Sequence, residues 1–256
     1  MIRPEKLKGH YCSDMTLACR LTVRGAFILF LLHGTTSSTG EVVAGTSPTG
    51  DALRQQLQVL IAQKAEHLSD PAFFVRLADI YLDLGDDVSM GTSDRKIAYE
   101  EGARLARLAL ELQEQNAQAH YLYAANLGSA AQLSGLMASA LSIQDLQRHV
   151  KRALELNPDH APALHMMGMM LDELPWLLGG DSDGALTYLQ RAVVANAGDV
   201  HARLDLARAY IKRKDPISAR REIEMILLQP LPSDFSTSDQ RHREEAMQLR
   251  DSLRSP

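Results

Sequence analysis

The chain has 256 residues, of which 45% are hydrophobic and 23% charged, and its formal net charge is −5. These are values of an ordinary globular protein, and they imply no strongly basic patch of the kind that nucleic-acid binding uses, so nucleic acid is not an expected partner. Aromatic residues make up only 5%, so the core must come mainly from Leu, Ala, Met and Val. Plentiful Ala and Leu favour helices over strands.

The N-terminal region has the pattern of a secretory signal. Arg20 and Arg24 precede the apolar run Ala26–Leu32, and small or polar residues follow it up to Gly40. Seven apolar residues are too few to span a bilayer, and this order of basic, apolar and small residues is typical of export signals. A buried N-terminal helix is the alternative interpretation. Residues 1–40 are therefore predicted to be a signal peptide and N-terminal extension.

The start and the end of this signal stay open. Met15 is a plausible true start, since it gives the basic region a usual length, and cleavage fits after Ser38 or after Ala44. Export predicts the periplasm as location, with membrane association left open. Cys19 is no lipobox cysteine, because its apolar run follows it.

Export would also change the chemistry of the chain. Cys12 and Cys19 are its two cysteines, so a processed chain has no disulfide, thiol nucleophile or cysteine metal site. Without residues 1–40 it keeps 22 Lys/Arg against 30 Asp/Glu, a net charge of −8. We expect an acidic, soluble protein.

Four similar helix pairs follow, starting near Pro71, Ala117, Ala161 and Val200. In each first helix a large residue, a small residue and an aromatic or aliphatic residue recur at helical spacing. They are Leu77/Ala78/Tyr81, Tyr123/Ala124/Leu127, Met167/Gly168/Leu171 and Leu206/Ala207/Tyr210. Small residues let paired helices approach, and large ones fill the groove between them.

The second helices carry a related pattern, in which three apolar or small residues recur at spacings of four and then three positions. It reads Gly102/Ala106/Ala109, Leu146/Val150/Ala153, Ala185/Leu189/Ala192 and Ala219/Ile223/Ile226. These residues resemble the tetratricopeptide repeat, whose period is about 34 residues. Only the fourth pair keeps uninterrupted spacing, and the other three carry insertions between their helices.

A single helix pair cannot bury its apolar face, so the pairs must stack. The fold class is therefore all-α. We predict one domain over 49–256, in which tetratricopeptide-like pairs close into a compact helical bundle with capping helices. The polar stretch from about Ser233 to Pro256 is the C-terminal cap.

The third insertion is the most specific segment. Pro175 disfavours helix at Leu174, and Gly179 and Gly180 permit positive φ before Asp181 or Asp183 caps the next helix. The only Trp of the chain, Trp176, therefore lies in a loop with Leu177. Such an apolar loop is expected to be tucked against the protein.

This segment, together with the preceding run Ala98–Leu112, resembles the TatT family of periplasmic tetratricopeptide proteins associated with TRAP-type solute transport. The family pairs an H-x-x-x-G helix with an LP-x-x-LGGD loop, matched here by His165 with Gly168 and by Leu174–Asp181. The His-to-Gly spacing is one residue short, and the lipobox of many members is missing. The resemblance implies a helical bundle with an apolar cavity that handles hydrophobic or amphipathic ligands beside a periplasmic binding protein.

The methionines around Gly168 allow three interpretations. Met166, Met169 and Met170 are core filler, a flexible lining for an apolar ligand, or, with His165, a Cu(I) site. Tyr121 and Asn126 could line a concave surface and orient an amphipathic ligand, with ordinary surface positions as the alternative. The other histidines are interpreted as surface or capping residues.

The sequence thus predicts a transport accessory that binds or passes an apolar, lipid- or sterol-like molecule and docks on a periplasmic solute-binding or transporter protein. The ligand residues would be Tyr121, Asn126, His165, Met166, Met169, Met170, Leu174, Trp176 and Leu177, with Pro175, Gly179, Gly180 and Asp181 shaping the loop. No catalytic motif is present, so no enzyme, cofactor or metal is predicted. A protein-interaction scaffold without a small ligand is the alternative, and homo-oligomerisation stays open.

Overall fold

The computed structural model describes residues 48–229 and 237–253, all of which lie in one structural unit spanning residues 39–256. Within these ranges the chain forms helices only. The first half holds α1 (Pro48–Gln63), η1 (Lys64–Glu66), α2 (Pro71–Asp86), α3 (Thr92–Leu112), α4 (Ala117–Ser134) and α5 (Leu136–Leu156). The second half holds α6 (Ala161–Glu173), η2 (Trp176–Leu178), α7 (Ser182–Ala195), α8 (Val200–Lys212), α9 (Pro216–Leu228) and α10 (Thr237–Ser252). The all-α prediction is confirmed.

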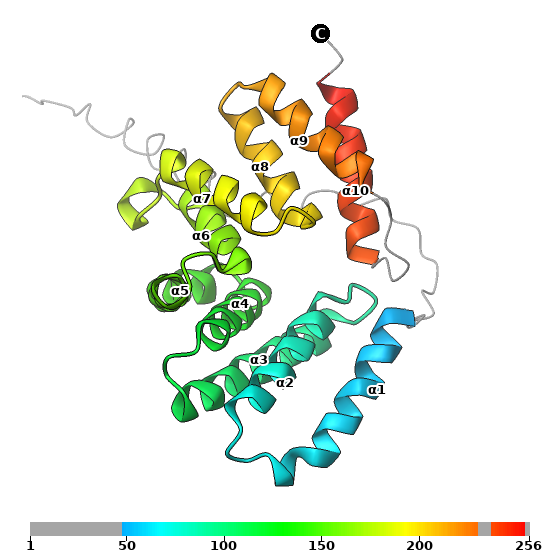
Figure 1. Cartoon of the computed structure of the whole chain (residues 1–256), viewed down its shortest axis with the longest axis vertical. Helices are drawn as coiled ribbons and strands as arrows, with labels where there is room; N and C mark the ends of the chain where they lie inside the picture. Colours follow the sequence, from blue (N-terminus) through cyan, green and yellow to red (C-terminus); the bar gives the residue numbers. More distant parts are fainter. Residues whose placement is uncertain (1–47, 230–236, 254–256) are drawn as a thin grey trace, which may run out of the picture. The chain divides into compact units, whose positions relative to one another are not determined.

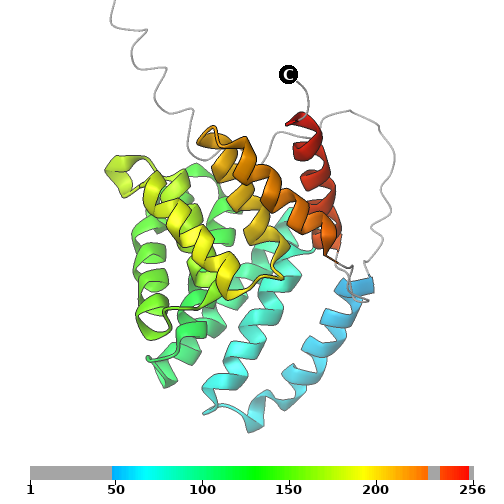
Figure 2. The ribbon, with the colours of Figure 1, turned by 45° about the horizontal axis from the view of Figure 1, so that its top comes forward.

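The helices pack as consecutive pairs, α2 with α3, α4 with α5, α6 with α7 and α8 with α9 (Figure 1). The first helices of neighbouring pairs also contact one another, α2 with α4, α4 with α6 and α6 with α8. At the two ends of this array, α1 packs against α2, and α10 packs against α8 and α9 (Figure 2). This is the stacking that the repeats predicted, with α10 as the C-terminal cap.

Each pair begins where the sequence placed it, because a capping side chain stands just before each first helix. The caps of α2, α4, α6 and α8 are Asp70, Asn116, His160 and Asp199, and each accepts a hydrogen bond from a backbone N–H of the first turn. Such a cap satisfies an N–H group that has no partner within the helix.

The repeat positions form the interfaces within and between the pairs. Ala78, Ala124, Gly168 and Ala207 are all buried, as are the small and large residues named above for the second helices. A Cβ on Gly168 would lie 2.7 Å from Leu189 Cγ, so a glycine is needed for this approach of α6 to α7.

Most of the extra residues of the first two pairs lengthen helices instead of forming loops. α2 and α3 are connected by residues 87–91, and α4 and α5 by Gly135 alone, whose φ is +100°. Only the third pair keeps an extended connection between its helices, from Leu174 to Asp181 around η2. None of the helices in the described ranges has both the length and the hydrophobicity needed to cross a membrane.

Candidate functional site

Tyr121 of α4 lies close to aromatic and acidic residues that belong to other first helices or their caps. Its ring packs against His160 with 5.3 Å between ring centroids, and the side chain is half-buried. Burial raises the pKa of its hydroxyl, and the negative charges of Asp86, Asp79, Asp199 and Asp83 raise it further. Carboxylates of α2 and of the α8 cap therefore face the same space as Tyr121. We call this region the inner-helix surface.

Three aspartates of α2 give this surface an acidic face, which we define as Asp79, Asp83 and Asp86. Their spacing of four and three residues places them on one side of the helix, and their side chains are exposed. Partial burial of the carboxyl raises the pKa of Asp83 to about 6, and the charges of Asp79 and Asp86 add to this rise. Asp79 and Asp83 have no ion pair with a described Lys or Arg.

Asp86 connects the acidic face to the C-terminal half of the chain. It accepts a hydrogen bond from the Tyr99 hydroxyl at 2.6 Å. Burial raises its pKa, while that hydrogen bond, the positive charges of Arg95 and Arg241 and, once it is protonated, His201 lower it. α2, α8 and α10 thus contribute charged groups to one surface.

Two histidines meet a buried aspartate farther along this surface, and we call His165, His201 and Asp205 the His–Asp cluster. His165 Nε2 lies 2.8 Å and His201 Nε2 lies 3.3 Å from Asp205 Oδ2. Arg208 forms an ion pair with Oδ1 of the same carboxylate and a second one with Glu245.

The protonation states in the cluster follow from burial and charge. Burial alone would raise the pKa of Asp205, but the hydrogen bond from His165 and the nearby positive charges hold it well below its usual range. Burial also lowers the pKa of His201, despite the opposing charge of Asp205. The cluster therefore combines an ionised carboxylate with a mainly neutral imidazole at neutral pH.

The cluster was only partly predictable. His165 is among the predicted ligand residues, whereas His201 and Asp205 are not. Their spacing of four residues on one helix is a signal that sequence reasoning could have used. Nothing in the sequence, however, places His165 opposite them, because that contact depends on how α6 packs against α8.

The predicted methionine site is part of the core. Met166 and Met170 pack against the cluster that contains Leu146 and Val150, whereas Met169 packs against the neighbouring cluster around Leu164. The three side chains thus fill gaps in two packing layers. This placement favours the core interpretation over the ligand lining and the Cu(I) site.

Asn126 is 0% exposed and does not reach the inner-helix surface. Its amide Nδ2 donates to the carbonyls of Ala78 and Leu122, at 3.3 and 2.9 Å, and its side chain packs against Gly102. It links α2, α3 and α4 in the core, so its predicted role as a ligand-orienting residue has no geometric basis.

The loop of the third pair also differs from expectation. Leu174 is buried, and Gly179 has the predicted positive φ, +93°, but Trp176 is 79% and Leu177 73% exposed. The apolar loop is therefore not tucked against the protein. Its contact with α5 includes a hydrogen bond from Gln147 to the Leu178 carbonyl.

The remaining loop residues have structural roles. Pro175 precedes η2, and a Cβ on Gly180 would lie 1.8 Å from the Leu174 carbonyl oxygen, so the turn requires glycine there. Asp181 caps α7 by accepting a hydrogen bond from the Asp183 N–H. The capping prediction is thereby confirmed for Asp181.

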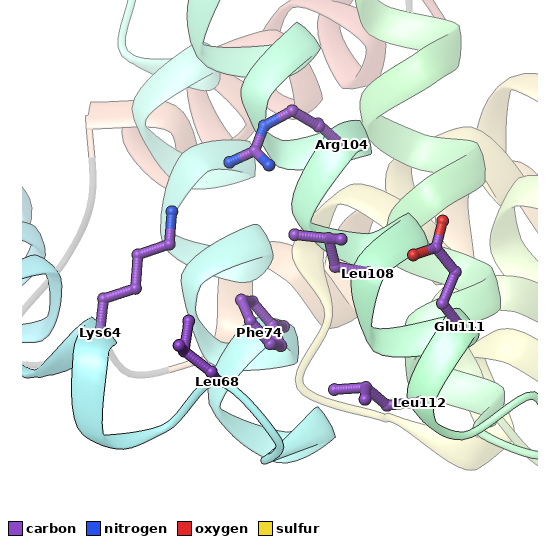
Figure 3. A pocket seen from close by; sticks show the side chains of 7 residues that line it. All are labelled: Lys64, Leu68, Phe74, Arg104, Leu108, Glu111 and Leu112. Carbon is purple, nitrogen blue, oxygen red and sulfur yellow. The ribbon is translucent and has the colours of Figure 1, made fainter.

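A small pocket lies at the first pair, away from the predicted ligand site (Figure 3). It has a volume of about 340 Å³ and lies between η1, α2 and α3. Leu68, Phe74, Leu108 and Leu112 give it an apolar wall, and Lys64, Arg104 and Glu111 add charged groups (Figure 3).

Two segments of the chain match known protein families. Residues 47–171, which hold α1 to α5 and most of α6, match the family described as regulator of microtubule dynamics protein 1-3. Residues 177–232 match a tetratricopeptide repeat family. Neither match supports the TatT resemblance, the transport role or lipid binding.

Individual relatives agree with these matches. Regulator of microtubule dynamics protein 1 from Bos taurus is 29% identical over 125 residues, 48% of this chain and 39% of the relative. Protein 3 from the same organism is 30% identical over 127 residues, 48% of this chain and 27% of the relative. The chain thus matches about two fifths or less of the length of these relatives.

A solved structure supports the fold. A thermophilic tetratricopeptide protein from Thermus thermophilus superposes with a TM-score of 0.57, covering 78% of this chain and 96% of its own, at 15% identity. The names of the two matched families describe a repeat and a regulator of microtubule dynamics, and neither name refers to an enzymatic reaction. The chain therefore has a fold of tetratricopeptide-like helix pairs, and its residues 47–171 are similar to the regulators of microtubule dynamics.

Proposed function

We propose that the chain is a protein-interaction scaffold whose inner-helix surface binds an extended partner segment carrying Lys or Arg side chains. The observation that carries this proposal is the acidic face of α2. Asp79 and Asp83 present exposed carboxylates beside Tyr121 without an ion pair to a described Lys or Arg.

Physical chemistry favours a cationic occupant. A carboxylate that is partly removed from water interacts more strongly with a positive charge than a fully solvated one does. Burial is the main cause of the raised pKa of Asp83, and the negative charges of Asp79 and Asp86 add to it, so a bound cation would relieve this repulsion. The half-buried ring of Tyr121 adds an aromatic face on which a guanidinium or ammonium group can rest.

The repeat architecture supports the same function. Stacked helix pairs produce extended surfaces that repeat proteins use to bind partners. The relatives are named for the regulation of microtubule dynamics, and the matched segment contains the acidic face. We extend to this chain the interaction role alone. Export to the periplasm stays a prediction, because residues 20–44 lie outside the described residues.

The proposal is tested with the full chain and two labelled eight-residue peptides, one rich in Lys and Arg and one rich in Glu. Fluorescence anisotropy should show binding of the basic peptide only, weakened roughly 3–10-fold by Asp83→Asn through loss of a charge-assisted contact. Glu100→Gln removes the same charge from the exposed side of α3 and should leave the affinity unchanged.

Acidity gives a second measurement on the same complex. Because the pKa of Asp83 is about 6, its carboxyl takes up a proton as the pH falls from 7 to 5, and affinity for the basic peptide should drop with it. Equal binding of both peptides, no binding of either, or equal effects of Asp83→Asn and Glu100→Gln would refute the proposed surface.

A further inference from the structure

We propose that His165, His201 and Asp205 form a binding site for Zn²⁺. One potential ligand atom from each of the three residues lies within 4.8 Å of the other two. This site goes beyond the proposed scaffold function and does not depend on it, because it uses other residues and another ligand.

The geometry is close to that of a zinc site. With bonds of about 2.0–2.1 Å, the ligand atoms of tetrahedral Zn²⁺ lie about 3.3–3.4 Å apart. The observed distances from Asp205 Oδ2 are 2.8 Å to His165 Nε2 and 3.3 Å to His201 Nε2. Small side-chain rotations would therefore place a cation between the three atoms.

The ligand set has the right chemistry. Two imidazole nitrogens and one carboxylate oxygen suit Zn²⁺, and three protein ligands leave a fourth position for water. In the metal-free protein an Nε2–H of His165 donates to Asp205. In a coordinating ring that holds a single proton on Nε2, metal binding would move this proton to Nδ1, so that Nε2 can donate its lone pair without net loss of a proton.

Neighbouring residues would hold the ligands in place. Arg208 binds Oδ1 of Asp205 and leaves Oδ2 facing the two imidazoles, and Glu245 offsets the charge of its guanidinium. Hydrogen bonds of this kind to a ligating carboxylate orient it toward the metal. The side chain of Asp205 is 1% exposed, so its charge is held in place with little competition from water.

His242 of α10 supplies a further, independent observation. Its ring is stacked on that of His201, with 4.5 Å between centroids and 9° between planes. It is 8% exposed, and its Nδ1 has no hydrogen-bond partner among the described residues. A buried ring nitrogen without a hydrogen-bond partner is costly, and the place of His242 beside the cluster fits a nearby cation site.

The site is accessible from one side. The side chain of His201 is 42% exposed and lies on the inner-helix surface near Asp86, whereas His165 and Asp205 lie deeper. A metal ion can therefore enter past His201 without unfolding of α6 or α8, and the open coordination position would face the solvent.

The test is a titration of the metal-free full chain with Zn²⁺ against a chromophoric chelator. Cys12→Ser and Cys19→Ser are present in every protein to remove thiolate ligands. We expect one Zn²⁺ per chain, and at least a tenfold weaker affinity in His201→Asn, a substitution at a half-exposed position that leaves the core of the protein unchanged. His67→Asn is the matched control, since His67 is half-buried at another place in the chain.

Co²⁺ gives a second readout that does not depend on affinity. Bound to the wild-type cluster, it should show the visible absorption of a tetrahedral site with nitrogen and oxygen ligands, and this spectrum should disappear in His201→Asn. Absence of stoichiometric Zn²⁺ binding would overturn the proposal. So would an affinity that His201→Asn leaves unchanged or that His67→Asn lowers equally.

Discussion

At the scale of single residues, close approach decides which positions tolerate change. Gly168 is buried on α6, and a Cβ there would lie 2.7 Å from Leu189 Cγ and 3.1 Å from the Leu189 backbone nitrogen. Gly128 is a helical glycine on α4 with more room, because its Cβ would lie 3.4 Å from the nearest atom, in the side chain of Leu146. The same change at these two positions should have opposite effects.

Gly168→Ala should lower the free energy of unfolding by about 1–2 kcal/mol. Replacing a helical glycine by alanine by itself stabilises the folded protein by up to about 1 kcal/mol. Forcing the added methyl group against a fixed backbone destabilises it by about 1–3 kcal/mol, which is the larger effect. Urea unfolding measured by circular dichroism checks this. Gly128→Ala is the control and should leave stability equal or raise it. A stabilised Gly168→Ala protein would show that α7 can move away.

At the scale of elements, the contact between α4 and α5 contains a pair of histidines. His120 Nδ1 lies 2.9 Å from His149 Nδ1, and His120 Nε2 lies 2.9 Å from the Glu114 carbonyl oxygen. If His120 donates to that carbonyl, its Nδ1 accepts from His149, and a second proton on His120 would place two N–H groups against each other. Burial lowers the pKa of both rings, that of His149 to about 4, with the charge of His120 as the second cause.

The histidine pair predicts acid sensitivity. A pKa that is lower in the folded than in the unfolded state contributes stability that is present above pH 6.5 and is lost as the pH falls toward 4. Between pH 6.5 and 5, the unfolding free energy of the wild type should therefore fall by roughly 1–2 kcal/mol more than that of His149→Gln. Urea titrations at several pH values measure this difference.

Asp83 acts in the opposite direction in this window, because its pKa is raised to about 6, but it is present in both proteins and cancels in the comparison. Parallel pH profiles of wild type and His149→Gln would contradict the assignment of the acid sensitivity to this pair.

At the scale of the whole molecule, the repeat array predicts that a destabilising substitution at one end unfolds that end without unfolding the other. α10 covers the last pair through Ala246, which is buried against Leu204, Ile223 and Ile226. The core around Phe73 and Leu105, built mainly by α2, α3 and α4, shares no residue with this cluster. Stacked repeats are stabilised mainly by their nearest neighbours.

Ala246→Asp should therefore open the C-terminal pair first. A buried, unpaired carboxylate costs several kcal/mol, so amide protons of α8, α9 and α10 should exchange much faster, while those of α2 to α4 keep their protection. Hydrogen exchange followed by mass spectrometry measures both regions at once. Gln248→Asp, at an exposed position of the same helix, is the control. Uniform loss of protection would show that the array unfolds as one unit.

The repeat pattern was readable because it depends on neighbours in sequence. The helix pairs start at Pro71, Ala117, Ala161 and Val200, as the spacing of small and large residues predicted. Capping residues at these positions act within one helical turn, so local chemistry fixes the boundaries. Periodicity could also have shown that Asp79, Asp83 and Asp86 share one side of α2.

The contacts between helices that are far apart in the sequence could not be predicted. The sequence by itself determined an all-helical tetratricopeptide array, because helix propensity, caps and small-residue spacing are local. Only the tertiary structure decided that Asn126 is buried and that Trp176 is exposed, since both depend on neighbouring helices. It also decided that His165 meets Asp205, 40 residues away, because α6 and α8 pack side by side.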